Sequence, residues 1–465
     1  MTSQPPSMLL TKPLRLAAAV GLAFAPPWSV QAYSLSEAVA AALAQDPAYL
    51  AAQQSRLAGQ EKKPQGVAGL LPSVSGTAAA RDYDYTSGTS SGEGLDYRSY
   101  SISLTQSLFN LSTIQAARQG FEQVKSSEAA FQTARQEALL RVAEAYFKVL
   151  TEQDNLASVQ AEKTAIGEQL EQAKRSFEVG SATVTDQQEA QARFDLAVAK
   201  EIAASNSLNI ARNALVLLTN RPLPAKLAGL AGPIAIAAPN PAASEPWVEQ
   251  ARTNSYPVLK AQAEATSARY EVTKKYAGHL PSLDLVANRT YNKDTASPDT
   301  NSSSNYVGLS LTVPLFAGGL TLSQTREASA LKAKADLDLQ AARLNAEQAA
   351  RTAYLNVVAG LSQVTALEAA EKSSKLALDS NKLGYEVGVR INIDVLNAQQ
   401  QLFAAQRDLS KARYDTLLAS LKLRASVGSL QTNDLDTVSR LMQPTSGAAT
   451  NSNNASSNAT AAKSQ

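Results

Sequence analysis

Two short segments carry residue types that could make polar contacts between helices. The later segment reads Tyr-Glu-Val-Gly over Tyr385–Gly388 and continues to Arg390, whereas the earlier reads Phe-Glu-Val-Gly over Phe177–Gly180 and continues to Thr185 and Asp186. Arg390 offers a planar fork of donors that suits a carboxylate, and Asp186 is the acid of the equivalent segment. A polar contact between the two segments is therefore chemically reasonable. The alternative is that Asp186 only caps a helix and that Arg390 is solvated.

Residues for covalent or metal-dependent catalysis are scarce. The chain has no cysteine, and this excludes disulfides, thiolate metal sites and a cysteine nucleophile. It has a single histidine, His279. We find no phosphate-binding loop, nucleophile triad or metal-ligand spacing, so we expect no enzyme activity, no cofactor and no metal. The 43 basic residues nearly balance the 41 acidic ones, which does not favour nucleic-acid binding.

The first 32 residues have the features of a secretory signal. Lys12 and Arg15 supply the positive start, Leu16–Val30 is a short apolar run broken by prolines, and Val30–Ala32 supplies small residues for cleavage. We therefore expect the mature chain to begin at Tyr33. No other apolar run approaches the ~20 residues of a membrane-spanning helix, so any membrane crossing by the mature chain must use strands.

The sequence of the first half returns in the second half. In the last three of the four matching pairs, the second copy lies 207 or 208 residues after the first. The matching pairs are Leu71–Val74 with Leu280–Leu283, Leu104–Phe109 with Leu311–Phe316, Ala145-Tyr146 with Ala353-Tyr354, and Phe177–Gly180 with Tyr385–Gly388. A repeat of this length indicates a duplicated half-subunit rather than a solenoid or heptad repeat.

Each half contains a segment with the pattern of two strands. Leu71–Phe109 is rich in Ser, Thr, Gly and Tyr, and apolar and small polar residues alternate through Val307–Leu315. This period of two is typical of strands with one apolar face, and the predicted loops are Tyr83–Tyr97 and Asn292–Asn305. Tyrosines near the strands are candidates for an aromatic girdle, although tyrosine is common in strands generally. They are Tyr83, Tyr97, Tyr100, Tyr291 and Tyr306.

The remaining segments of each half predict helices. An Ala-rich helix from Leu35 to about Lys63 should end at Pro64 and Gly66. A helix from about Thr113 to Val179 would rise ~100 Å, which requires long helical neighbours.

The long helices should end at identifiable residues. Gly180 and Gly388 have the character of helix C-terminal glycines. Thr185–Gln188 has the form of a capping box that opens a return helix to about Thr219. The predicted segments are a signal peptide (1–32), a first-half N-terminal helix (33–65), a first β-hairpin (66–111), a first helical hairpin (112–221), a linker or equatorial region (222–246), a second-half N-terminal helix (247–279), a second β-hairpin (280–317), a second helical hairpin (318–430) and an equatorial or disordered tail (431–465).

Strand number is the constraint that predicts an assembly. Four strands cannot close a barrel, and an open sheet edge in lipid leaves backbone groups unpaired. Two copies would supply eight strands and three would supply twelve, which is wide enough for a lumen. Cyclic symmetry is the usual arrangement of such copies, and the long helices, which would form a tube of the same symmetry, favour three or more copies.

The second helix turn, Gly384–Asn397, and its continuation to Leu430 resemble the TolC family of outer-membrane channel proteins. The resemblance extends over nearly the whole mature chain and includes Pro314–Gly319, which follows the last strand. It implies a mainly α fold with a β-barrel portion: a homotrimer with a 12-stranded outer-membrane β-barrel, continued by a 12-helix periplasmic α-barrel and surrounded by an equatorial belt.

The same resemblance implies a gate at the periplasmic end. Tyr385 and Arg390 would be donors, and Thr185 and Asp186 would be acceptors. Asp394 matches a position that lines the constriction, where three copies would form an acidic ring; its alternative role is to complement a helix dipole. Asn397 stands where the family often has a second acid, so we expect a weaker ring.

The leading functional prediction is a passive exit duct of a type I secretion system in the outer membrane of a Gram-negative cell, extending into the periplasm. It would work with a periplasmic adaptor protein and an inner-membrane ABC or proton-driven transporter. Multidrug efflux is the first alternative. A periplasmic coiled-coil scaffold without a pore is an alternative of another class, but it would not explain the alternating strands.

Overall fold

The computed structural model describes residues 33–83, 95–180, 183–230, 236–294 and 301–442. The predicted signal peptide, most of the two predicted strand loops and the chain beyond residue 442 lie outside these ranges.

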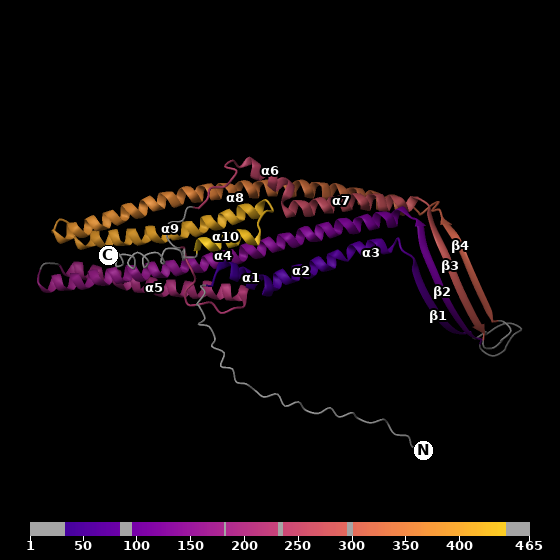
Figure 1. The fold of residues 1–465 in the computed structure, drawn as a ribbon, viewed down its shortest axis with the longest axis horizontal. Helices are drawn as coiled ribbons and strands as arrows, with labels where there is room; N and C mark the ends of the chain where they lie inside the picture. Colours follow the sequence, from indigo (N-terminus) through magenta and orange to yellow (C-terminus); the bar gives the residue numbers. More distant parts are fainter. Residues whose placement is uncertain (1–32, 84–94, 181–182, 231–235, 295–300, 443–465) are drawn as a thin grey trace, which may run out of the picture. The chain divides into compact units, whose positions relative to one another are not determined.

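Both halves of the chain fold into the same order of elements (Figure 1). The first half contains α1 (Leu35–Gln45), α2 (Pro47–Gln60), α3 (Lys62–Ala68), β1 (Ser73–Tyr83), β2 (Leu95–Phe109), α4 (Leu111–Glu178) and α5 (Val184–Thr219). The second contains α6 (Glu245–Asn254), α7 (Tyr256–Tyr276), a 3₁₀ turn (Ala277–His279), β3 (Ser282–Asp294), β4 (Ser302–Thr312), α8 (Leu320–Glu386), α9 (Asn392–Ser426) and α10 (Thr432–Met442). The long helices have 68 and 67 residues and the return helices 36 and 35, so the duplication is confirmed in three dimensions.

The N-terminal helical segment differs from its prediction at Pro64 and Gly66. The helix is interrupted at Glu61 instead, and α3 then continues to Ala68. Pro64 lies in the first turn of α3, where a helix has no acceptor for its N–H groups. Gly66 permits close approach to α4, because a Cβ there would lie 3.0 Å from the Cα of Ala117.

The four strands form one antiparallel sheet in the order β1-β2-β3-β4. The register places Val74 opposite Leu104, Leu104 opposite Ala287, and Ala287 opposite Val307. Residues directly opposite one another share a face, so one face is apolar, whereas the other carries Ser, Thr and Asn. β1 and β4 are the edge strands, and neither outer edge is paired with another described strand. β4 ends at Thr312, before the last residues of the predicted alternation.

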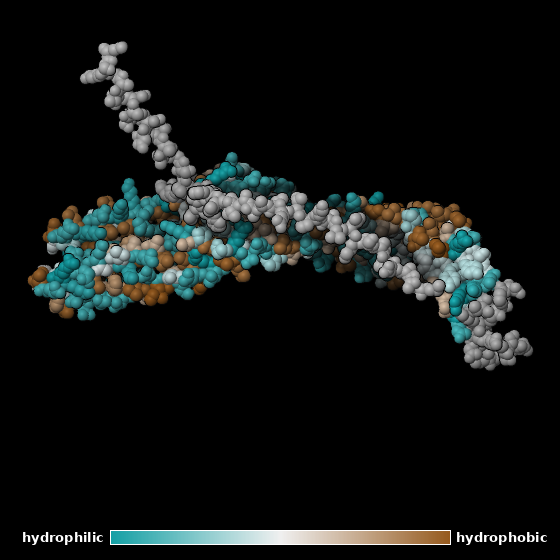
Figure 2. Space-filling model, turned by 60° about the horizontal axis from the view of Figure 1, so that its bottom comes forward, coloured by the Kyte–Doolittle hydropathy of each residue, from teal (hydrophilic) through white to brown (hydrophobic). Residues whose placement is uncertain are grey.

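The helices position the two turns far from the sheet. α5 packs along α4, α9 packs along α8, and α7 contacts both α4 and α8. The α4–α5 and α8–α9 turns lie at the end of the helices away from the strands (Figure 1). Hydrophobic residues gather on the surface where the helices meet the sheet (Figure 2).

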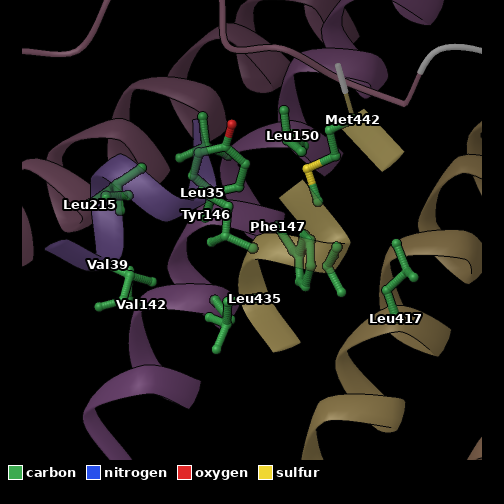
Figure 3. Packing of buried hydrophobic residues seen from close by; sticks show 14 of the residues in the cluster. Leu35, Val39, Val142, Tyr146, Phe147, Leu150, Leu215, Leu417, Leu435 and Met442 are labelled. Carbon is green, nitrogen blue, oxygen red and sulfur yellow. The ribbon is translucent and has the colours of Figure 1, made fainter. Parts of the chain in front are cut away.

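The largest hydrophobic core lies midway along α4 and joins both halves of the chain (Figure 3). Leu35 of α1, Tyr146 of α4 and Leu435 of α10 are fully buried in it. The Tyr146 hydroxyl donates to the backbone oxygen of Tyr33 at 2.9 Å. The predicted equatorial tail therefore begins with a helix, α10, that is part of this core.

A polar link borders the same core. The Tyr414 hydroxyl of α9 donates to Oδ2 of Asp154 on α4 at 2.9 Å, and the Tyr414 ring stacks on Phe147. Burial raises the pKa of the Asp154 carboxyl above its usual value. The neighbouring Gln153 donates to the backbone oxygen of Leu227 and accepts from its N–H, which fixes the chain that follows α5.

Among the described residues, no helix combines the length and the hydropathy that a membrane-crossing helix needs.

Candidate functional site

The two helix turns are built by the same backbone device. α4 ends at Glu178 and α8 at Glu386, and the glycine two residues after each end has positive φ, 75° at Gly180 and 78° at Gly388. The Gly180 N–H donates to the Phe177 oxygen and the Gly388 N–H to the Tyr385 oxygen. Glycine adopts this left-handed conformation without the strain that a Cβ would add. The predicted C-terminal glycines are confirmed.

The capping box of α5 begins at Thr183, so the prediction that it begins at Thr185 is wrong. Thr183 Oγ1 accepts from the Asp186 N–H at 3.2 Å, and Asp186 Oδ2 accepts from the Thr183 N–H at 3.0 Å and from its hydroxyl at 2.7 Å. The residue at the third helical position is therefore Asp186 itself. Thr185 lies exposed in the first turn of α5.

The second turn carries Tyr385, Arg390 and Asp394. Nη1 of Arg390, which precedes α9, lies 3.7 Å from Oδ2 of Asp394, four residues further on. The Arg390 N–H donates to the backbone oxygen of Gly384. Tyr385 is half-buried and packs against a small cluster that includes Val395. Within the described part of one chain, neither Tyr385 nor Arg390 bonds to Thr185 or Asp186, so the predicted gate contacts stay predictions.

Asn397 is engaged by an arginine that sequence reasoning did not identify. Nη2 of Arg193 on α5 donates to Asn397 Oδ1 at 3.2 Å, and its Nη1 donates to Gln400 Oε1 at 2.8 Å. The guanidinium thus spans two amide side chains one turn apart on α9. The first helical hairpin is thereby joined to the residue predicted at the constriction.

A buried amide pair lies beside this contact. Nε2 of Gln169 on α4 donates to Oδ1 of Asn392 at 2.5 Å, and both side chains are buried. Leu396, one turn further along α9, inserts among apolar residues of α4 and α5. These are Ile166, Leu170, Ala173, Ala190 and Ala197. The start of α9 is therefore seated against both helices of the first hairpin.

A buried carboxylate forms the third contact between the hairpins. Glu162 of α4 is 1% exposed and lies 3.0 Å from Nζ of Lys200 on α5 and 2.8 Å from Nη1 of Arg407 on α9. Its sequence position carried a signal, because Glu162 falls in the buried stripe of α4 between Val159 and Ile166. A carboxylate in such a stripe requires partners, and the helices supply two.

Comparison with known proteins identifies the fold and its family. A family profile described as "Outer membrane efflux protein" matches the chain twice, over residues 38–221 and 247–429. The chain belongs to this family. Its two matches cover the two duplicated halves separately, which agrees with the repeat in the sequence and in the structure.

Relatives and a solved structure agree with this assignment. This chain is 34% identical to outer membrane protein TolC of Vibrio cholerae, over 91% of this chain and 96% of that protein. It is 35% identical to the alkaline protease secretion protein AprF of Pseudomonas aeruginosa, over 85% of each chain. The crystal structure of outer membrane protein VceC of Vibrio cholerae matches its fold with a TM-score of 0.74 and 20% identity, over 85% of this chain and 96% of VceC.

The family assignment confirms several sequence-based predictions. The resemblance to TolC proteins is confirmed, and the chain is an outer-membrane transport protein of the efflux family, not an enzyme. Among the described residues, no group of three or more His, Asp or Glu side chains is placed to hold a metal ion.

Proposed function

We propose that three copies of this chain form an exit duct through the outer membrane and into the periplasm. The observation that carries the proposal is the four-stranded sheet with one open edge on β1 and another on β4. Pairing β4 of one copy with β1 of the next satisfies both edges, and three copies close a twelve-stranded barrel with a lumen.

Exposed apolar residues on the helices support the same assembly. Ile202, Ile210 and Leu217 lie exposed on α5, and Leu337 and Leu344 lie exposed on α8. Large apolar side chains repeated along a helix surface favour burial against another helix. In the trimer, neighbouring copies would cover these surfaces, and the four long helices of each copy would form a twelve-helix tube.

We infer type I protein secretion as the transport process. AprF, by its name, serves secretion of an alkaline protease. The duct would receive cargo from an inner-membrane transporter through a periplasmic adaptor protein, because nothing in the described chain resembles an energy-coupling site. Multidrug efflux is the second candidate, and the description of the family favours it.

The helix turns would form the gate between copies. Both bonds from Thr183 use Oδ2 of Asp186, so neither of them occupies Oδ1, which could accept from a donor of the partner subunit. Arg390 and Tyr385 would supply such donors to Asp186 and Thr185, because Arg390 is exposed at its turn.

Asp394 would line the constriction as a ring of three carboxylates that favours cations. Two features weaken this ring. Arg390 stands 3.7 Å from the Asp394 carboxylate and offsets part of its charge. Asn397 is neutral and accepts from Arg193, so it adds no second acidic ring.

Single-channel recording in a planar bilayer tests the proposed duct. We expect discrete, small conductance steps from the purified full chain, because the proposed gate would restrict the lumen. A scaffold without a pore would give no steps, and that result would refute the duct. A host that lacks its own outer-membrane component then separates the two candidate processes. Protein export is read as secretion of a protease by this host, and drug efflux is read as its drug resistance.

A further inference from the structure

The apolar face of the sheet ends in a row of tyrosines bordered by basic residues. Tyr100 of β2 is paired directly with Tyr291 of β3. One row closer to the helices Ile102 is paired with Arg289, and one row further away Arg98 is paired with Lys293. Alternate residues of a strand share a face, so these residues all lie on the face of Leu104 and Val307.

The register corrects the predicted girdle. Tyr97 is paired with Asp294, and Tyr306 is paired with Asn288, which places both tyrosines on the polar face. Only Tyr100 and Tyr291, among the tyrosines whose side chains the structure describes in these strands, lie on the apolar face. Both are about half exposed, as expected for side chains that reach a membrane interface.

Two of the cations form no ion pair with the side chains that the structure describes. Arg289 and Lys293 are exposed, and neither makes a hydrogen bond or ion pair with a described residue. Asp82 and its register partner Asp96 lie on this face one row beyond Arg98. This acidic row is three rows from Arg289, or ~20 Å at ~3.3 Å per residue, and one row from Lys293. Towards the helices, Arg289 borders Leu104 and Ala287 rather than a carboxylate.

The position of these cations relative to lipid follows from the apolar rows beneath them. Leu285, Leu309, Ala287 and Val307 lie on the same face towards the helices and would face hydrocarbon in the proposed barrel. A cation is costly in the middle of the hydrocarbon but tolerated at the interface, where its stem lies along apolar surface and its head reaches polar groups. Arg289 and Lys293 are four positions apart, a rise of ~13 Å, so both heads can reach one headgroup layer.

We propose that Arg289 and Lys293, with Tyr291 between them, bind the phosphate of a phosphorylated lipid headgroup in the outer leaflet. Arginine forms a two-bond contact with phosphate oxygens, lysine adds a point charge, and the tyrosine hydroxyl can donate a further bond. The leaflet is the outer one, because the helices that would extend into the periplasm are connected to the opposite end of the sheet. The assignment rests on the proposed barrel, which sets the lipid-facing side.

Lipid that copurifies with the full chain from outer membranes tests this site. The probe is a phosphorylated outer-leaflet lipid, measured by native mass spectrometry and by phosphorus content. We expect the double variant Arg289→Gln/Lys293→Gln to retain at least fivefold less of it than the wild type. The matched control Lys372→Gln/Lys375→Gln, which removes equal charge from exposed positions of α8, should retain the wild-type amount. Equal retention by the Arg289/Lys293 variant would overturn the site.

Two further measurements fix the source of the phosphate and the state of the barrel. Wild-type chain in vesicles should bind the phosphorylated lipid and not its dephosphorylated form, and inorganic phosphate should not displace it. Displacement by an equal concentration of inorganic phosphate would indicate a free-phosphate site and overturn the headgroup assignment. The double variant should keep wild-type conductance. A wild-type chain that does not conduct would refute the proposed duct. Lipid retention is measured independently of conductance, so the lipid site and the duct are tested separately.

Discussion

Arg407 of α9 and the buried Glu162 of α4 form an ion pair that joins the two helical hairpins of one chain, with Nη1 and Oε2 2.8 Å apart. Glu162 lies 18 residues before Gly180, which places the pair ~27 Å above the turn at 1.5 Å per residue. The pair, together with Lys200, therefore holds α9 against the first hairpin at a level above the proposed gate.

Arg407→Gln should destabilise the folded chain by about 2–3 kcal/mol. The loss should be smaller than that of a buried charge left with no partner, because Lys200 still contacts Glu162. The measurement is the free energy or rate of unfolding of the detergent-solubilised protein. Lys411→Gln removes an exposed pair with Asp415 on the same helix and should change stability little. Equal effects of the two substitutions would show that the buried pair does not hold the hairpins.

Arg390→Ser should raise the single-channel conductance several-fold, because it removes the main proposed donor between copies at the gate. Tyr385→Phe should give a smaller rise, since it removes one hydroxyl and keeps the packing against Val395. Conductance is recorded in a planar bilayer under the same salt for both variants. If both retain the wild-type conductance, these residues do not hold the gate.

Asp394→Ala should lower the preference of the channel for cations over anions. The carboxylate ring is the proposed source of selectivity, and its removal also leaves Arg390 without its partner in the turn. Reversal potentials in a salt gradient measure the change. The control Asp415→Ala removes an exposed acid far from the turn, and it should leave the reversal potential as in the wild type. An unshifted potential in Asp394→Ala would remove the proposed ring.

Asp154→Asn should alter how stability depends on pH. Burial raises the pKa of the Asp154 carboxyl in the folded state, so the folded state binds its proton more tightly than the unfolded state. This stabilising contribution is complete below the unfolded pKa and is lost as pH rises through the folded pKa. The asparagine variant cannot ionise, so its stability relative to the wild type should improve as pH rises from the acid range to neutrality. A constant difference across that range would contradict the assignment.

The elements of the fold could be predicted because their signals are local. Strict alternation gives the strands, apolar residues at spacings of three and four give the long helices, and Gly180 and Gly388 mark their ends. The capping box of α5 was misplaced by two residues because Thr183 and Thr185 are both suitable caps. Only the backbone conformation at Thr183 decides between them.

The contacts between hairpins could not be predicted because they depend on how far α9 is shifted along α4. Gln169 lies 11 residues before its glycine, whereas Asn392 lies only four after its own, so the equivalent turns do not meet in register. The same shift brings Arg193 to Asn397. The sequence places each residue on a helix but does not contain the offset between helices.

The mass of the folded, detergent-solubilised full chain tests the central claim most directly. The account predicts a complex of three chains with native strand and helix content, because a four-stranded sheet with two open edges closes only by pairing with other copies. A single chain that is stably folded, with both edge strands retained, would contradict the account.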